Sequence, residues 1–149
     1  MVVSTCKIRV RYAETDQMGY CYYGNYPGFL EMGRVEALRE LGIRYRDLEE
    51  KGIMLPVSSL EIKYKIPIRY DEHITVETTI LNLPEGTRIP FSYQIFNENG
   101  DLATTAEVVL VSASVETGRP QAMPKEILNV LKPYFLWSIN LVKLEDVFR

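Results

Sequence analysis

The stretch that decides the fold is Arg11-Tyr-Ala-Glu-Thr-Asp-Gln-Met-Gly-Tyr-Cys-Tyr-Tyr-Gly-Asn-Tyr26, which joins a strand-like run to the first clear helix signal. It places one short carboxylate side chain, Asp16, a few residues before the helix start, among glycines and tyrosines. The N-terminus of a helix presents unpaired backbone N–H groups and partial positive charge, so it can hold a developing oxyanion while a nearby carboxylate attacks or activates water. This pairing suggests a hydrolase.

The residues on either side of this stretch predict a strand before it and a helix after it. Residues 6–11 alternate apolar and basic side chains, which is the period of a half-buried strand. In residues 25–41, apolar side chains recur at three- and four-residue spacing, with Asn25 suited to the N-cap and Gly42 to the C-terminal stop. Gly33, on the apolar face of this helix, would let the helix lie close against a sheet.

The composition is that of one soluble domain, with 149 residues of which 46% are hydrophobic and 25% charged. A net charge of -3 argues against a nucleic-acid partner. Cys6 and Cys21 cannot build a disulfide framework, and a single histidine leaves no Cys/His cluster with zinc spacing, so we expect no metal. No stretch approaches the roughly 20 apolar residues of a membrane span, and the N-terminus lacks a long apolar core. We therefore expect a cytoplasmic protein.

Strand signals dominate the chain after a short helix expected over residues 44–51. The expected strands are residues 55–66, 74–83, 88–97 and 102–115, each rich in Val, Ile, Thr and Tyr, with turns at residues 67–72, 84–86 and 97–101. One strand, one central helix and four long antiparallel strands indicate an α+β domain over residues 1–132. Long antiparallel strands leave an edge, and pairing of two edges across a two-fold axis would give a dimer.

The C-terminal part of the chain is expected to begin with a short helix over residues 125–132, ended by Pro133. Residues 133–149 are strongly apolar with few charges. We expect this extension to pack on the domain or on a neighbouring subunit, because so apolar a segment is unfavourable in water.

A specific spacing accompanies this order of elements. It runs Arg11-x-x-Glu-Thr-Asp16-x-x-Gly19-x-x-x-Tyr23-x-Asn25-Tyr26, then Phe29-Leu-Glu31 and Arg34-x-Glu36-x-Leu-Arg-x-x-Gly42, and continues through Leu55-Pro-Val57, Tyr64-x-x-Pro67 and Arg69-Tyr-Asp71 to about residue 120. These features resemble the hotdog-fold acyl-CoA thioesterases of the 4-hydroxybenzoyl-CoA thioesterase type. The likeness does not cover the C-terminal extension.

The resemblance implies a long central helix wrapped by an antiparallel sheet of five to six strands. It further implies dimers, often paired into tetramers, with acyl-CoA sites at the dimer interface and no cofactor beyond the CoA of the substrate. Carried onto this chain, it makes Asp16 the catalytic carboxylate and the backbone N–H of Tyr23 or Gly24 the donor to the thioester carbonyl. Many bacterial members have His where this chain has Tyr23, so any mechanism that uses that imidazole is absent here.

Further residues are expected to contact the substrate, some as part of a tyrosine cluster and some as cations near the CoA phosphates. They are Tyr12, Thr15, Asn25, Tyr26, Glu31, Ser58, Lys63 and Arg88, with Lys65 and Arg69 as further candidate cations. Asp16 could act as general base toward water or as nucleophile. By its position alone, Asp16 could equally be a loop or helix-capping residue.

Other chemistries compete with this interpretation. Glu31 and Glu36 lie on the helix, where another hotdog branch carries its carboxylate, although both could be solvated or paired with arginines. His73 is the one histidine and is expected at a strand end, which argues against the hotdog dehydratases, because these need an active-site histidine. A serine hydrolase built on Ser58 would lack a nearby histidine in sequence. Hydrolysis of acyl groups on acyl carrier protein, and acyl binding without chemistry, remain alternatives.

Overall fold

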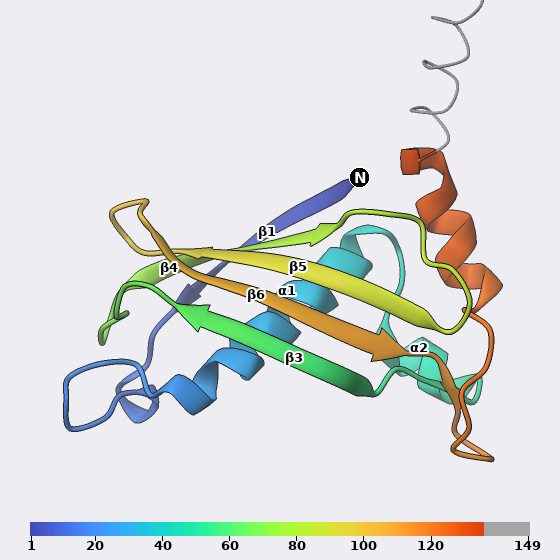
Figure 1. The fold of residues 1–149 in the computed structure, drawn as a ribbon, viewed down its shortest axis with the longest axis horizontal. Coiled ribbons are helices and arrows are strands. Elements are labelled where there is room, and N and C mark those ends of the chain that lie inside the picture. Colours follow the sequence, from blue (N-terminus) through green and yellow to red (C-terminus); the bar gives the residue numbers. More distant parts are fainter. Residues whose placement is uncertain (136–149) are drawn as a thin grey trace, which may run out of the picture.

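The computed structural model describes residues 1–135 and contains a five-stranded antiparallel sheet in the order β1-β4-β5-β6-β3 (Figure 1). The strands are β1 (Val2–Arg9), β3 (Val57–Tyr64), β4 (His73–Ile80), β5 (Arg88–Phe96) and β6 (Leu102–Val111). Along β4 and β5, the side chains that face the core alternate with less buried ones, which is the two-residue period of a half-buried strand. The β-branched segments therefore form the sheet that the sequence predicts.

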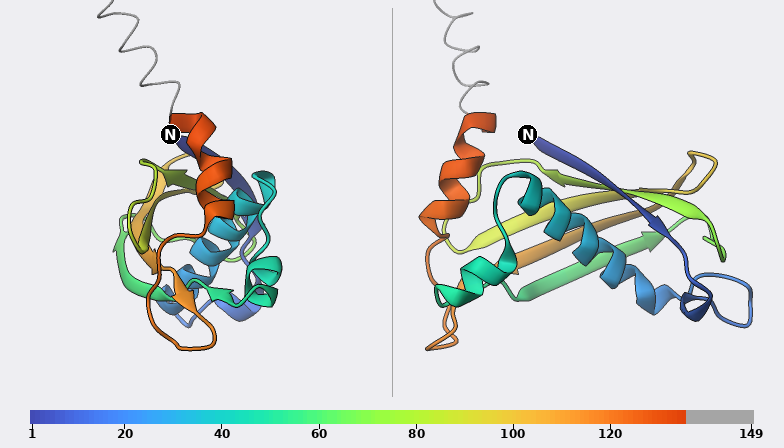
Figure 2. Two further views of the ribbon diagram at one scale, coloured as in Figure 1. Left: turned by 90° about the vertical axis from the view of Figure 1, so that its right-hand side faces the viewer. Right: turned by 180° about the vertical axis from the view of Figure 1, so that it is seen from behind.

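The central helix α1 (Tyr26–Glu40) lies across the concave face of this sheet, and the end-on view in Figure 2 shows the sheet curving around it. A Cβ atom added to Gly33 would lie 2.6 Å from Oγ1 of Thr78 and 2.9 Å from Cγ1 of Val76, so only glycine permits this close approach. The expected hotdog arrangement, a long helix wrapped by an antiparallel sheet, is confirmed.

Shorter elements complete the part of the chain that the structure describes. Helix α2 (Tyr45–Glu50) follows α1, and β2 (Ile53–Met54) pairs with β7 (Ala113–Ser114) in a separate two-stranded sheet. Two 3-10 turns, η1 (Tyr12–Glu14) and η2 (Tyr23–Asn25), flank the loop before α1. Residues 125–135 are helical.

Three expected boundaries are wrong. The strand expected over residues 55–66 is shorter, because β3 covers only Val57–Tyr64 and Pro56, just before it, has no N–H for a ladder bond. The run at residues 102–115 breaks at Ser112, whose N–H donates to the carbonyl of Thr87 (2.7 Å). The last helix does not stop at Pro133 but continues to residue 135. Proline removes one helical hydrogen bond, and here that loss does not end the helix. Most of the apolar extension expected over residues 133–149, namely residues 136–149, lies outside the described part.

The two edges of the sheet differ in how much of their apolar surface is covered. On β1, the inward-facing side chains of Val2, Ser4 and Ile8 are buried beneath α1. On β3, by contrast, the large side chains near α1 remain open to solvent: Leu60 is 44% exposed and Tyr64 is 47% exposed. The β3 edge is therefore the uncovered side of the fold.

Candidate active site

Residues 16–20 form a tight turn around Asp16. The N–H of Asp16 donates to the carbonyl of Tyr20 (2.9 Å), and Gly19 reverses the chain at φ +77°. Oδ1 of Asp16 accepts hydrogen bonds from the N–H groups of Met18 (2.9 Å) and Tyr20 (3.3 Å). The turn holds the carboxylate by this one oxygen, so within the described residues Oδ2 is left for a water molecule or a thioester carbon.

The chain then enters α1 through η2, the turn that contains the expected oxyanion donors. The N–H groups of Tyr23 and Gly24 open this turn and have no hydrogen-bond acceptor within residues 1–135. A Cβ atom on Gly24 would lie 2.6 Å from a ring carbon of Tyr22, so the ring occupies the space a side chain would need. The helix start therefore offers two free donors in a fixed geometry.

Asp16 and Tyr23 line one pocket of about 260 Å³, which lies between the loop, the start of α1 and the end of β3. Its other lining residues are Met18, Tyr20, Cys21, Tyr26, Tyr64, Lys65, Ile66 and Pro67. We name it the Asp16 pocket. It is smaller than the roughly 300–1,000 Å³ of typical ligand sites, so a single chain encloses only part of a large ligand.

Aromatic side chains fix the wall of the Asp16 pocket. The hydroxyl of Tyr64 donates to the carbonyl of Tyr23 (3.0 Å), and the ring of Tyr64 packs edge-on against Tyr26 at 4.8 Å between centroids. Tyr26 itself is buried, and desolvation raises the pKa of its hydroxyl to about 12. Tyr26 is therefore a neutral wall residue at physiological pH, as the aromatic cluster in the sequence suggests.

Cys21 is the pocket's other candidate nucleophile, and its environment opposes that role. The side chain is buried, and desolvation, followed by the charges of Glu14 and Asp16, raises the pKa of its thiol to about 11. Because the thiolate is the reactive form of cysteine, this thiol is protonated and unreactive near pH 7. The carboxylate of Asp16 remains as the candidate reactive group of the pocket.

Two residues expected to contact substrate donate hydrogen bonds to the backbone of the loop before α1. Nδ2 of Asn25 donates to the carbonyl of Glu14 (2.8 Å), and Oγ1 of Thr15 donates to the carbonyl of Tyr12 (2.7 Å). Asn25 occupies the N-cap position of α1, but its side chain makes no capping bond, and its backbone is helical (φ −86°, ψ −17°) rather than extended as in a usual N-cap. Tyr12 lies outside the Asp16 pocket and packs edge-on against Tyr70 at 5.6 Å.

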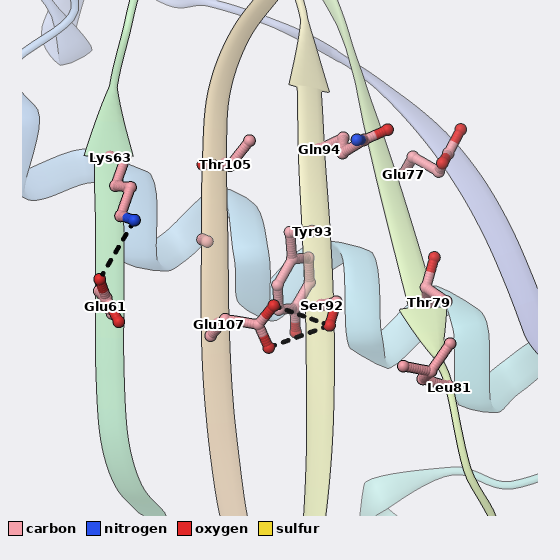
Figure 3. Close-up of a pocket in the computed structure, with 11 residues that line it drawn as sticks. Glu61, Lys63, Glu77, Thr79, Leu81, Ser92, Tyr93, Gln94, Thr105 and Glu107 are labelled. Atoms are coloured by element: carbon pink, nitrogen blue, oxygen red, sulfur yellow. Dashed lines mark hydrogen bonds and ion pairs between the residues drawn. The ribbon is translucent and has the colours of Figure 1, made fainter.

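The expected residues on the strands lie away from the Asp16 pocket of their own chain. Lys63 is on the outer face of the sheet, where it pairs with Glu61 at 3.8 Å in a shallow pocket of about 450 Å³ (Figure 3). Arg88 lies in another outer pocket, with Pro84 and Glu85. Ser58 donates to the carbonyl of Val109 (3.1 Å). Lys65, a further candidate in the sequence, does line the Asp16 pocket, whereas Arg69 stacks over the ring of Tyr20 at 4.9 Å.

Glu31 is exposed on α1 and lines a second pocket of about 190 Å³ between α1 and β3. Glu36 pairs with Arg39 at 3.7 Å on the outer side of the helix, and His73 begins β4. Neither Glu36 nor His73 lines the Asp16 pocket. Glu31 does not line the Asp16 pocket of its own chain either, but it is the one of these three residues that lies in the groove between α1 and β3.

Metal-binding clusters and membrane-spanning helices are both absent from residues 1–135. Among these residues, no three His, Cys, Asp or Glu side chains come together as a potential metal site. No helix in this part of the chain combines the length and apolar character needed to cross a membrane.

Several pocket residues could not be identified from the sequence as site residues. Tyr64, Ile66 and Pro67 reach the Asp16 loop through tertiary contacts, including the hydrogen bond from the N–H of Cys21 to the carbonyl of Ile68 (2.6 Å). The one available signal was strand alternation: Lys63 and Tyr64 are adjacent, so they point to opposite faces of the sheet.

Comparison with known proteins places this fold and pocket in a family. A model described as the thioesterase-like superfamily matches residues 10–131. YbgC of Escherichia coli, named an acyl-CoA thioester hydrolase, is 30% identical over 125 residues, covering 84% of this chain and 92% of YbgC. YneP of Bacillus subtilis, which carries the provisional name acyl-CoA thioesterase, is 39% identical over 120 residues, covering 80% of this chain and 86% of YneP.

A solved structure agrees with these relatives. The crystal structure of a DHNA-CoA thioesterase from Staphylococcus aureus has a TM-score of 0.79 and 36% identity, and the alignment covers 99% of this chain and 93% of that one. Sequence and fold comparisons agree with one another across most of the chain. The chain therefore belongs to the thioesterase-like superfamily.

Proposed function

We propose that this protein hydrolyses acyl-CoA thioesters to a free carboxylic acid and CoA, with Asp16 as the reactive carboxylate. The observation that carries the proposal is that Asp16 and the free N–H at Tyr23 line one pocket at the start of α1. The names of the relatives YbgC and YneP support the same reaction and the same carrier.

The chemistry needs few groups, because a thiolate leaves a thioester without strong help from a general acid. Oδ2 of Asp16 either removes a proton from the attacking water or attacks the carbonyl carbon itself. The carbonyl oxygen gains negative charge as the new C–O bond forms, and the N–H groups of Tyr23 and Gly24 stabilise that charge. The C–S bond then breaks and the CoA sulfur takes up a proton. When water is the nucleophile, the acid leaves directly as a carboxylate. When Asp16 is the nucleophile, the acyl group remains on it as a mixed anhydride, and a water molecule hydrolyses this anhydride, which releases the carboxylate product and restores Asp16. Lys65 at the pocket wall is placed to meet a CoA phosphate.

A homodimer formed through the β3 edges, with pairing of dimers into tetramers, is part of the proposal. The unpaired strand edge and its exposed apolar side chains support a second copy of the chain as the partner. The proposal also includes a cytoplasmic location, since the two cysteines are free.

Replacement of the reactive carboxylate tests the function. In a thiol-release assay with a panel of acyl-CoA thioesters, Asp16→Asn is expected to lower kcat by roughly 10²–10⁴-fold, the range of a lost general base. The variant should keep its fold by circular dichroism and its mass by light scattering, because Asn can accept the bonds from Met18 and Tyr20. Near-normal turnover by the variant would rule out Asp16.

The same assay separates the alternatives. Faster turnover of acyl groups on acyl carrier protein than on CoA would indicate the other carrier. Tight acyl-CoA binding with no thiol released by the unmodified protein would indicate a binding module.

A further inference from the structure

Arg34 is a buried cation without a charge partner. It lies within the sheet-facing stripe of α1, and only 9% of the residue is exposed. Its Nε is enclosed and has no hydrogen-bond acceptor, and no carboxylate in residues 1–135 lies within ion-pair distance. The hydroxyls of Tyr45 and Tyr93 are its polar neighbours, and burial raises the pKa of both, so they stay neutral. A buried charge is costly unless it is paired, so the single chain leaves this guanidinium uncompensated.

The uncompensated guanidinium lines the second pocket, which we name the Arg34 pocket. Pro27, Gly28, Leu30 and Glu31 of α1 form one wall, and Val57 and Leu60 of β3 form the other, with Val108 beneath. The Arg34 pocket and the Asp16 pocket thus occupy the same groove between α1 and β3. The Arg34 pocket lies beside the first half of β3, whereas the Asp16 pocket lies beyond its last residue, Tyr64.

A two-fold axis through the β3 edge would bring these two pockets together. Antiparallel pairing of one strand with its own copy places the start of β3 in one subunit opposite the end of β3 in the other. The Arg34 pocket of one subunit would then face the Asp16 pocket of its partner. Gly28 is exposed near the middle of this groove, and a Cβ atom on it would meet nothing within 4 Å, so the partner's helix has room to approach.

We propose that Arg34 of one subunit completes the Asp16 site of the other, as a substrate-binding residue on the acyl side of the thioester. This inference rests on the proposed thioesterase function and on the β3 dimer. Charge complementarity supports it: the Asp16 pocket contains a carboxylate, whereas the wall that faces it contains a buried guanidinium with no ion pair within residues 1–135, and the carboxylate on that wall, Glu31, is exposed to solvent.

The guanidinium has a defined part in the hydrolysis. The reaction adds negative charge to a site that already holds the Asp16 carboxylate, first on the carbonyl oxygen and then on the carboxylate product. The N–H groups of Arg34 can donate to these oxygens, and an arginine can bind a carboxylate through two parallel hydrogen bonds. Loss of Arg34 should therefore weaken both transition-state stabilisation and product binding in the partner's site.

Subunit complementation tests this arrangement directly. Asp16→Asn and Arg34→Met are each expected to lower kcat/KM by about tenfold or more as homodimers. After the two variants are unfolded together and refolded at equal concentration, half of the dimers contain one chain of each kind. One of the two sites in such a dimer combines an intact Asp16 with an intact Arg34 from the other chain. The mixture should therefore regain about a quarter of the wild-type activity.

The alternatives give different results. If Arg34 acts within its own chain, or only stabilises the fold, no site in the mixture is intact and activity does not return. Full activity of the Arg34→Met homodimer would also overturn the inference. The absence of turnover by the wild-type protein on every acyl-CoA would instead refute the proposed function.

Two further variants keep the result interpretable. Arg39→Met removes an exposed arginine from the same helix, where it pairs with Glu36, and should leave kcat/KM unchanged. If Arg34→Met fails to fold, Arg34→Lys retains the charge but not the two parallel hydrogen bonds. The lysine variant should show reduced activity as a homodimer and the same recovery when mixed with Asp16→Asn.

Discussion

At the scale of single residues, the neighbours of Cys21 decide which group in the Asp16 pocket reacts. Burial, followed by the charges of Glu14 and Asp16, raises the pKa of the thiol to about 11. At pH 8 the thiolate fraction is then about 0.1%, against roughly 10% for a thiol of pKa 9. On a Cys6→Ala background, the rate of alkylation by iodoacetamide should therefore keep rising up to a midpoint near pH 11.

The pH profile also has an internal control. Because the Asp16 charge raises the pKa of Cys21, Asp16→Asn should shift the alkylation midpoint to lower pH. A midpoint near pH 9 in the parent protein would contradict the effect of burial on the thiol, and the absence of a shift in the Asn variant would show that the thiol does not sense the carboxylate.

At the scale of elements, the contact between α1 and the sheet depends on Gly33. Valine and glycine differ by only a few tenths of a kcal/mol in helix propensity, so Gly33→Val tests mainly the close contact with Val76 and Thr78. Overpacking typically costs about 1–3 kcal/mol, and we expect the free energy of unfolding in urea to fall by about that amount.

Met32→Val places the same side chain at an exposed position of the same helix and should change stability by less than about 0.5 kcal/mol. Equal stability of the two variants would contradict the close packing.

At the scale of the whole molecule, β3 should be the edge through which two copies join. Leu60→Asp puts a charge into the uncovered groove, so light scattering should show the mass of a single chain and the thiol-release assay a large loss of activity. Val3→Asp makes the same kind of change at an exposed position of β1, the other edge, and should leave the mass unaltered. If instead the β1 variant dissociates and the β3 variant does not, the proposed interface is on the wrong edge.

The three scales also differ in what the sequence could predict. Asp16, Tyr23 and Tyr26 could be assigned to one site from the sequence, because a single short loop joins them. Helix α1 could be predicted because its apolar side chains keep the helical period over many residues. Which face of the sheet each strand residue occupies was harder to predict. We expected Lys63 near the substrate, but in the single chain it lies on the outer face, since its neighbour Tyr64 points to the inner face. The absence of an ion pair to Arg34 could not be predicted from the sequence, because an arginine on a helix ordinarily pairs with a carboxylate or is exposed to solvent. The packing of the structure shows that this arginine is buried and makes no ion pair within residues 1–135.

The hydrogen bonds that tie the loop to the helix start have a consequence for how this enzyme could diversify. The amide of Asn25 donates to the carbonyl of Glu14, and the hydroxyl of Tyr64 donates to the carbonyl of Tyr23. These bonds fix the part of the proposed site around Asp16 and Tyr23 within one chain. The wall around Leu60 and Glu31, which faces that site in the proposed dimer, makes none of these bonds. Mutations there can alter which acyl group is accepted while leaving the bond-breaking geometry intact. Selection for a new substrate and selection for catalysis can therefore act on separate parts of the sequence.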